Sequence, residues 1–304
     1  MAARFWRHLL GWQLLTAAAV TALLAAALSL SAAELVPTAL LVMIATPCLL
    51  VASSFLVGRL AARRNGGGER TPLRGLPTAL LRETLAFCAA TFATIAEPYR
   101  RAPRVAAARA GAASPVLLIH GIVCNRSVWR PLLARLAAQG FAPVRAVSLE
   151  PLFADLDSQA ASVVRELREL QRSSAGLPVA IVAHSMGGLL ARAALAAGGP
   201  GLVSRIVTIA SPHHGTALAR LFRPVPARQM RPGSAWLQAL NAGEGGAWPV
   251  PVTSIYSLHD NLIAPPRSAA LAGARVHELT GLGHLSLLRA RVSLEHTLAA
   301  LAGP

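Results

Sequence analysis

Residues 179–188 read VAIVAHSMGG and decide the fold of the C-terminal part of the chain. The first five are small or β-branched and uncharged, which is typical of a strand buried on both faces of a parallel sheet. Residues 186–197 then fit a helix. Ser185 therefore lies at a strand-to-helix turn. Ala183 and Gly187 stand two residues before and after it, where such a tight turn needs small side chains.

The same alternation of short β-branched runs and helical runs continues through residues 114–304. We expect strands at residues 116–119, 142–149, 179–183, 205–209, 252–258 and 275–279, with helices at 129–139, 158–172 and 186–197. This order predicts an α/β domain, a mainly parallel sheet with helices on both faces. Functional groups in such a sheet lie beyond the carboxyl ends of the strands.

Ser185 fits the position of an activated nucleophile. The turn lifts its hydroxyl clear of the sheet, and the first amides of the following helix stabilise negative charge. Ala183 replaces the glycine that this motif usually has, and its methyl group is small enough for the turn. The alternative is a serine that only caps the helix.

An acid and then a histidine should follow such a nucleophile. Asp260 lies just past the expected strand 252–258, where a loop can direct it at an imidazole; the other acids after Ser185 are Glu244, Glu278 and Glu295. His284 lies in the glycine-rich loop 281–286 after the last expected strand; the competing histidines are His277 and His296. We predict Ser185, Asp260 and His284 as a catalytic triad. The alternatives are a turn-forming aspartate and an ordinary loop histidine.

The negative charge that develops during acyl transfer needs two backbone N–H donors. Met186, directly after the nucleophile, is expected to supply one. Ile122, on the loop after the first strand, is expected to supply the other, and Gly121 allows that loop to turn. His120 is expected to orient the loop by hydrogen bonding.

Two long uncharged runs, at residues 9–33 and 35–57, precede this domain. Each exceeds the roughly 20 residues that a helix needs to cross a bilayer. Arginines flank the pair on both outer sides, and the link between the runs has none; they are Arg4, Arg7, Arg59, Arg63 and Arg64. The positive-inside rule then predicts a transmembrane hairpin within residues 1–64, with helices at about 9–31 and 36–57 and both ends in the cytoplasm.

Two alternatives stay open for this region: a cleaved signal peptide over residues 1–33, and a hairpin buried in a soluble protein. With a cleaved first run, the second run would still act as a stop-transfer segment. Whether or not the first run is cleaved, we expect the catalytic domain on the cytoplasmic face of the inner membrane.

Residues 65–113 are expected to link the hairpin to the catalytic domain. Residues 65–75 are rich in Gly and Arg, as in a linker. The run 80–96 predicts either an amphipathic helix at the membrane surface or a helix packed on the catalytic domain. A basic stretch follows and is expected to hold the domain near anionic lipid; its arginines are Arg100, Arg101, Arg104 and Arg109.

Composition excludes several classes of protein. The 304 residues carry 29 basic and 13 acidic side chains, a net charge of +16, and 54% are apolar. This apolar content excludes a disordered chain, and three cysteines are too few for a disulfide scaffold. The charge is divided evenly between residues 1–113 and 114–304, +8 each, and no nucleic-acid-binding module accompanies it. An anionic membrane is therefore the expected partner, and nucleic acid is not.

Four segments in this order resemble the α/β-hydrolase lipases and esterases of bacteria: LIHG at 118–121, AHSMGG at 183–188, SPHHGT at 211–216 and GHLS at 283–286. The Ala-His-Ser-Met-Gly form is similar to that of minimal bacterial lipases, and the hairpin looks like that of membrane-associated proteobacterial lipases. The resemblance implies the roles given above for Ser185, Asp260, His284, Ile122 and Met186. It also implies that residues 211–216 line the rim of the site, where His213 has a structural role.

Some lipases of this type bind calcium through pairs of aspartates. Asp155 and Asp157 precede an expected helix and are interpreted as caps, so no metal and no cofactor are predicted. The insertion 217–250 between two strands is rich in large apolar residues. It predicts a cap over an acyl pocket, with Phe222, Trp236 and Leu237 as substrate contacts; the alternative is ordinary packing of a long loop.

The hypothesis from sequence is a membrane-anchored serine hydrolase that cleaves carboxylic esters, lipid or acyl esters above all. Ser185 at the turn excludes a dehalogenase, which needs an acid there. An acyltransferase and a peptidase use the same triad and stay open. A non-catalytic membrane-tethered scaffold is the third alternative, although an intact triad argues against it.

Overall fold

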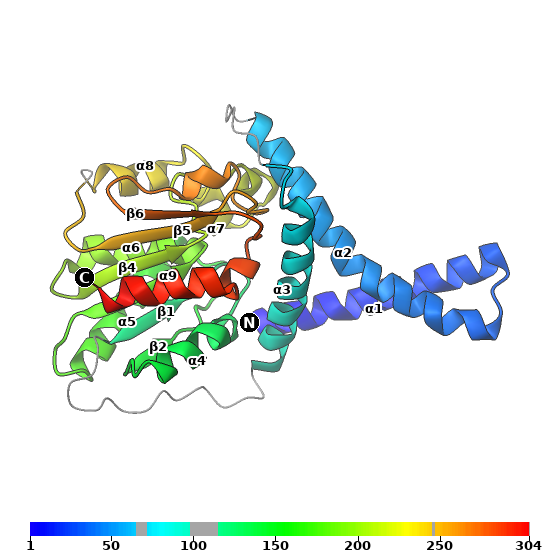
Figure 1. The fold of residues 1–304 in the computed structure, drawn as a ribbon, viewed down its shortest axis with the longest axis horizontal. Helices are drawn as coiled ribbons and strands as arrows, with labels where there is room; N and C mark the ends of the chain where they lie inside the picture. The colour runs from blue at the N-terminus through cyan, green and yellow to red at the C-terminus, as the bar shows by residue number, and fades with distance from the viewer. Residues whose placement is uncertain (65–71, 98–114, 245–246, 304) are drawn as a thin grey trace.

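The computed structural model describes residues 1–64, 72–97, 115–244 and 247–303. Most of the predicted linker 65–75 and all of the basic stretch 100–109 lie outside the described residues. The described chain forms a sheet with helices on both faces, and three N-terminal helices lie along one edge of it (Figure 1).

Six strands make the sheet, in the order β2-β1-β3-β4-β5-β6, and every neighbouring pair is parallel. They are β1 (Val116–Ile119), β2 (Val144–Ala146), β3 (Val179–His184), β4 (Val203–Ile209), β5 (Val252–Ser257) and β6 (Arg275–Leu279). The predicted parallel sheet is confirmed. Because all six strands run the same way, the loops after them meet at one edge.

Helices cover both faces of the sheet, as the two-sided apolar strands require. In β1, Leu117 and Ile119 face the side covered by α5 (Leu156–Arg172) and α6 (Met186–Gly198). The alternate residues Val116 and Leu118 face α4 (Arg130–Ala138) and α9 (Arg291–Ala302). Strands β1 and β3 are buried along their whole length.

The edge strand β2 is shorter than the predicted 142–149. It begins after Pro143, which has no N–H to give to a ladder. Beyond β2 the chain leaves the sheet edge, because the N–H of Leu149 donates to Nε2 of His120 instead. The other strands and helices predicted within residues 114–304 match within two residues at each end. The three N-terminal helices are shifted or longer than predicted, because each begins four to seven residues before its expected start.

Short helices connect the larger elements. The insertion 217–250 folds into η3 (Ala217–Leu221), α7 (Val225–Gln229) and α8 (Ala235–Ala242). The remaining 3₁₀ turns are η2 (Arg126–Trp129), η4 (Pro266–Ala269) and η5 (Ser286–Leu288).

The N-terminal region forms a helical hairpin and a third helix. The hairpin consists of α1 (Ala2–Leu28) and α2 (Ala32–Arg64), and α3 (Leu76–Ala96) lies between it and the sheet (Figure 1). All three helices are long and apolar enough to cross a membrane. Large apolar side chains are exposed along the projecting part of the hairpin: Leu9, Trp12, Leu14, Leu15, Leu23, Leu28, Leu35, Val36, Leu40, Leu41, Ile44, Leu49 and Leu50. These long apolar helices indicate that the protein associates with membranes.

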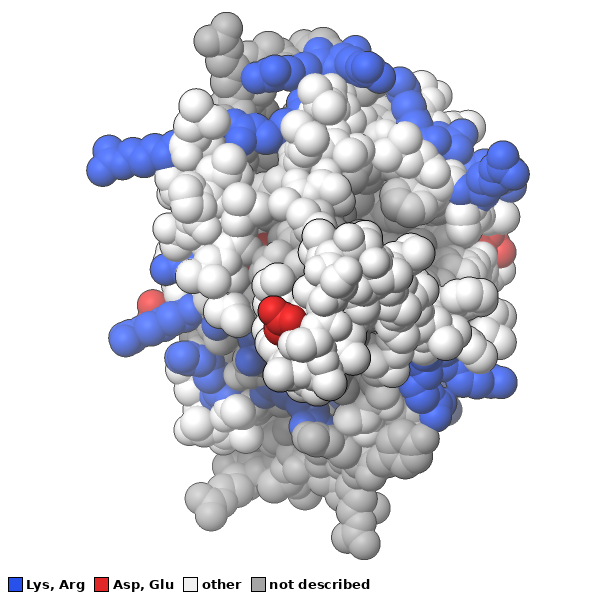
Figure 2. Space-filling model, turned by 90° about the vertical axis from the view of Figure 1, so that its right-hand side faces the viewer, with Lys and Arg blue, Asp and Glu red and all other residues white. Residues whose placement is uncertain are grey.

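Viewed along the hairpin, the molecule presents a largely uncharged centre with Arg side chains around it (Figure 2). A single acidic side chain stands out on the white projection, and the hairpin turn carries Glu34, whose carboxylate accepts hydrogen bonds from Ser31. Basic side chains therefore surround the uncharged projection, an arrangement consistent with association with a membrane.

The inner ends of the hairpin pack on the catalytic domain. In α1, Ala2 and Ala3 are buried, and Nε1 of Trp6 donates to the carbonyl of Val123. In α2, Ala62 packs against η3 and Gly58 lies against the loop after β5. The hairpin is therefore part of the folded unit at its base.

Replacing Gly58 by alanine is expected to disturb this docking. Its Cβ would lie 2.8 Å from the carbonyl oxygen of Asn261, a backbone atom that cannot rotate away. We expect Gly58→Ala to cost about 1–3 kcal/mol of stability, measured as a lower Tm in detergent micelles. Gly11→Ala on α1 is the matched control, because its Cβ would meet nothing within 4 Å. An unchanged Tm for Gly58→Ala would contradict the docking.

Candidate active site

Ser185 lies at a strained turn between β3 and α6. Its φ of 56° and ψ of −128° belong to a region that residues with a side chain rarely adopt. Close packing of the neighbouring backbone holds the turn, and this packing requires glycine at two positions. A Cβ at Gly187 would lie 2.6 Å from the carbonyl oxygen of Ile119, and one at Gly121 would lie 2.8 Å from Cβ of Ser185. The loop after β1 therefore touches the serine directly.

His284 and Asp260 form a buried pair. Nδ1 of His284 lies 2.9 Å from Oδ2 and 3.1 Å from Oδ1 of Asp260. The carboxylate is fixed in turn by the N–H groups of Leu262 and Ile263, which donate to Oδ1. Burial lowers the pKa of His284, but the neighbouring negative charges outweigh it, so the pKa lies above its ordinary value.

The histidine loop lies against the serine turn. The rings of His184 and His284 are 4.6 Å apart between centroids, and Nε2 of His184 is 3.3 Å from the carbonyl oxygen of His284. His184 directly precedes Ser185. Within the described chain, Nε2 of His284 has no hydrogen-bond partner, and the bonds of its ring go to Asp260 alone.

Ile122 and Met186 both present amides that are not used by the described residues. The N–H of Met186 belongs to the first turn of α6, where a helix has no internal acceptor. Ile122 lies in the loop after β1, and its N–H donates to no backbone or side-chain acceptor in the described ranges. His120 holds this loop as expected: its Nδ1 is 2.7 Å from the carbonyl of Gly121, and burial lowers its pKa to about 4. The ring therefore stays neutral at physiological pH.

The other candidate acids and histidines are engaged elsewhere. Glu244 pairs with the buried Arg192, Glu278 with Arg267 and Glu295 with Arg291. His277 and His296 stack on each other, with ring centroids 3.9 Å apart. His213, expected to be structural, is buried and accepts from the Arg192 guanidinium through its carbonyl.

The three predicted substrate contacts lie in different surroundings. Leu237 is buried in the core beside α6, and Trp236 packs at the edge of the same cluster while its Nε1 donates to Asp157. Phe222 is 55% exposed at the end of η3. The predicted role of these residues remains a prediction.

Asp155 caps α5, as the sequence predicts, by accepting a hydrogen bond from the N–H of Ser158. In the ranges that the structure describes, no group of three or more His, Cys, Asp or Glu side chains could hold a metal ion.

Sequence reasoning missed the part that the N-terminal helices take in the site. Each of the three contacts a different loop at the carboxyl edge of the sheet. Trp6 of α1 bonds to the loop after β1, Ser54 of α2 accepts from Asn261 beside Asp260, and Glu83 of α3 accepts from the loop of His284. The signal available for Glu83 was its charge within the largely apolar run 80–96, where Arg82 is the other charged residue, since an ionisable residue in such a run is often functional.

Comparisons with known proteins agree with this architecture. The profile described as "Alpha/beta hydrolase family" matches residues 116–257. The structure resembles lipase B of Aspergillus fumigatus with a TM-score of 0.56 and 20% identity over 62% of this chain and 52% of that one. It resembles the mature lipase BlEst2 of Bacillus licheniformis with a TM-score of 0.57 and 17% identity over 66% of this chain and 96% of that one. The chain thus spans about half the length of the fungal lipase, and these low identities indicate the fold alone. No curated protein matches the sequence.

The pairing of His284 with Asp260 predicts a measurable titration. Because negative charge raises the pKa of His284, its imidazole should gain a proton at a higher pH than an ordinary histidine. In Asp260→Asn the burial remains and the largest attraction is lost, so the pKa should fall below the ordinary value. NMR titration of labelled histidine in the full-length protein in micelles measures both. Equal pKa values in the two proteins would contradict the pairing.

Proposed function

We propose that this protein, which has the α/β-hydrolase fold, is a membrane-bound serine hydrolase that cleaves carboxylic esters. Ser185 is the nucleophile, His284 the base and Asp260 the acid that orients it. The observation that carries the proposal is the strained Ser185 turn at the same sheet edge as the buried His284–Asp260 pair. Backbone strain of this kind persists where the surrounding structure holds a reactive group in place.

The proposed reaction is acyl transfer through the serine. Nε2 of His284 takes the proton of the Ser185 hydroxyl, and the Ser185 oxygen bonds to the ester carbonyl carbon. The amides of Ile122 and Met186 stabilise the oxyanion, and the alcohol leaves with the proton that His284 returns. His284 then takes a proton from water, whose oxygen bonds to the acyl carbon; the bond from this carbon to the Ser185 oxygen breaks, His284 returns the proton to that oxygen, and the acid is released.

The proposed substrates are lipids or other long-chain acyl esters. Support comes from the three apolar helices that contact the loops carrying Ile122, Asp260 and His284. Helices that enter the membrane would cover this site and place it close to the bilayer. Long-chain esters are concentrated there. The exposed Phe222, at the end of η3 beside α2, is a candidate acyl contact, and Trp236 and Leu237 remain proposed contacts on α8.

Ser185→Ala is expected to reduce ester hydrolysis more than about a thousandfold, because the nucleophile is lost. The measurement is release of p-nitrophenol from butyrate and palmitate esters by the full-length protein in micelles. Ser173→Ala, at the exposed end of α5, is the control and should retain wild-type activity. Faster turnover of the palmitate ester would support a lipase.

Two results would contradict ester hydrolysis: a folded wild type with no activity, or full activity in Ser185→Ala. Adding an acceptor alcohol distinguishes hydrolysis from transfer, because an acyltransferase forms a new ester in place of the free acid.

The proposed topology is a two-pass hairpin in the inner membrane with the catalytic domain in the cytoplasm. In a background where Cys48, Cys88 and Cys124 are alanine, Ser31→Cys in the exposed hairpin turn should react with an impermeant maleimide in intact bacterial cells. Ser173→Cys should react only after lysis. The opposite pattern would show that the catalytic domain lies outside.

A further inference from the structure

The helix α3 places one carboxylate against the loop that carries His284. Oε1 of Glu83 lies 2.9 Å from the amide nitrogen of Leu285, and Oε2 lies 2.8 Å from that of Ser286. Both amides belong to the residues directly after the histidine. Glu83 is only 2% exposed, so the carboxylate is removed from water and its oxygens depend on these two donors.

Gly283, directly before His284, makes room for the carboxylate. A Cβ at this position would lie 2.6 Å from Oε2 of Glu83. On the other side of the loop, the N–H of His284 donates to Oδ1 of Asn261 at 2.9 Å. The backbone around His284 is therefore held between α3 and the loop of Asp260. Gly283 allows the Glu83 carboxylate to approach this backbone closely.

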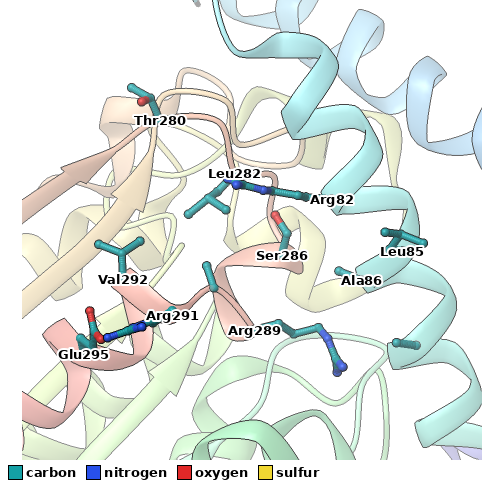
Figure 3. Close-up of a pocket in the computed structure, with 12 residues that line it drawn as sticks. Arg82, Leu85, Ala86, Thr280, Leu282, Ser286, Arg289, Arg291, Val292 and Glu295 are labelled. Carbon is teal, nitrogen blue, oxygen red and sulfur yellow. The ribbon is translucent and has the colours of Figure 1, made fainter.

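The contact is local and does not follow from general packing of α3 on the domain. Beside Glu83 the helix stands away from the domain and leaves a cavity of about 630 Å³ between α3 and the segment from β6 to α9 (Figure 3). Arg82, Leu85 and Ala86 line it from α3, and Ser286 lines it from the loop. The Glu83 carboxylate therefore holds the His284 loop by specific hydrogen bonds beside this cavity. The Arg82 guanidinium donates a longer hydrogen bond, of 3.3 Å, to the carbonyl of Gly281.

Glu83 also contributes charge at the histidine. The ionisable groups that face His284 are Asp260 on the loop after β5, His184 at the end of β3 and Glu83 on α3. Burial lowers the pKa of His184 well below its ordinary value, so that ring is neutral. Burial raises the pKa of the Glu83 carboxyl, whereas the hydrogen bonds from the two loop amides stabilise its ionised form. As carboxylates, Asp260 and Glu83 both favour the protonated form of His284.

We propose that Glu83 is a positioning residue that holds the His284 loop for catalysis, so that the docking of α3 and the activity are coupled. The inference rests on the proposed function. It assigns to an N-terminal apolar helix a direct part in setting the position of the base.

The test compares Glu83→Gln with Glu97→Gln in the full-length protein in micelles. An amide side chain has one acceptor oxygen, so the Leu285 N–H, which lies near both oxygens of the carboxylate, loses at least one acceptor and an NH₂ group then faces the loop amides. We expect Glu83→Gln to lower kcat at least tenfold with KM within twofold. The acid limb of the kcat/KM profile should move to lower pH, because the pKa of His284 falls when a negative charge is removed. Glu97 also joins α3 to the domain, through Arg126 of η2, and its variant should keep kcat and the acid limb.

A wild-type kcat and an unshifted acid limb in Glu83→Gln would overturn the proposal, and so would equal losses in both variants. Glu83→Asp keeps the charge and provides a second test of the proposal if the amide variant fails to fold. It should keep the acid limb of the wild type while kcat falls, because the shorter side chain draws the loop out of place. A wild type inactive on esters would contradict the proposed function. NMR titration of His284 in Glu83→Gln would then still test the charge coupling, and an unchanged pKa would overturn it.

Discussion

The parallel direction of all six strands is the constraint on which the rest of the structure depends. The carboxyl ends of parallel strands lie on the same side of the sheet. The sheet alone therefore brings together residues that are far apart in the sequence. Ser185 follows β3, Asp260 follows β5 and His284 follows β6. The apolar residues that bury both faces of β1 and β3 secure this edge, because a slip of one residue would turn every side chain to the opposite face.

Glycines at this edge work by allowing close approach. Gly187 lets the serine turn settle on the carbonyl of Ile119, Gly121 brings the loop after β1 to the serine, and Gly283 admits the Glu83 carboxylate. At all three positions a methyl group would lie too close to a neighbouring atom. The close contacts at Gly187 and Gly121 hold the turn of Ser185 in its strained conformation.

The N-terminal helices cover the carboxyl ends of the strands. Their inner parts supply hydrogen-bonding groups to loops of the catalytic domain, whereas the outer part of the hairpin exposes apolar side chains. Membrane attachment and construction of the site are thus combined in the same helices. Under the proposed function, α3 connects membrane attachment with the position of the His284 loop.

The sequence by itself determined the alternation of strands and helices, the parallel sheet, the Ser185 turn and the apolar hairpin. These follow from local periodicity and spacing, which do not depend on distant contacts. The order of motifs also sufficed to single out Asp260 and His284, which the structure brings within hydrogen-bonding distance. Only the tertiary structure decided that Glu244, Glu278 and Glu295 are engaged by arginines, and that Leu237 is buried in the core. It alone revealed Glu83, because a carboxylate on α3 meets amides some two hundred residues later in the chain. No periodicity records a pairing between segments so far apart, and only the packing of the helix on the sheet edge creates it.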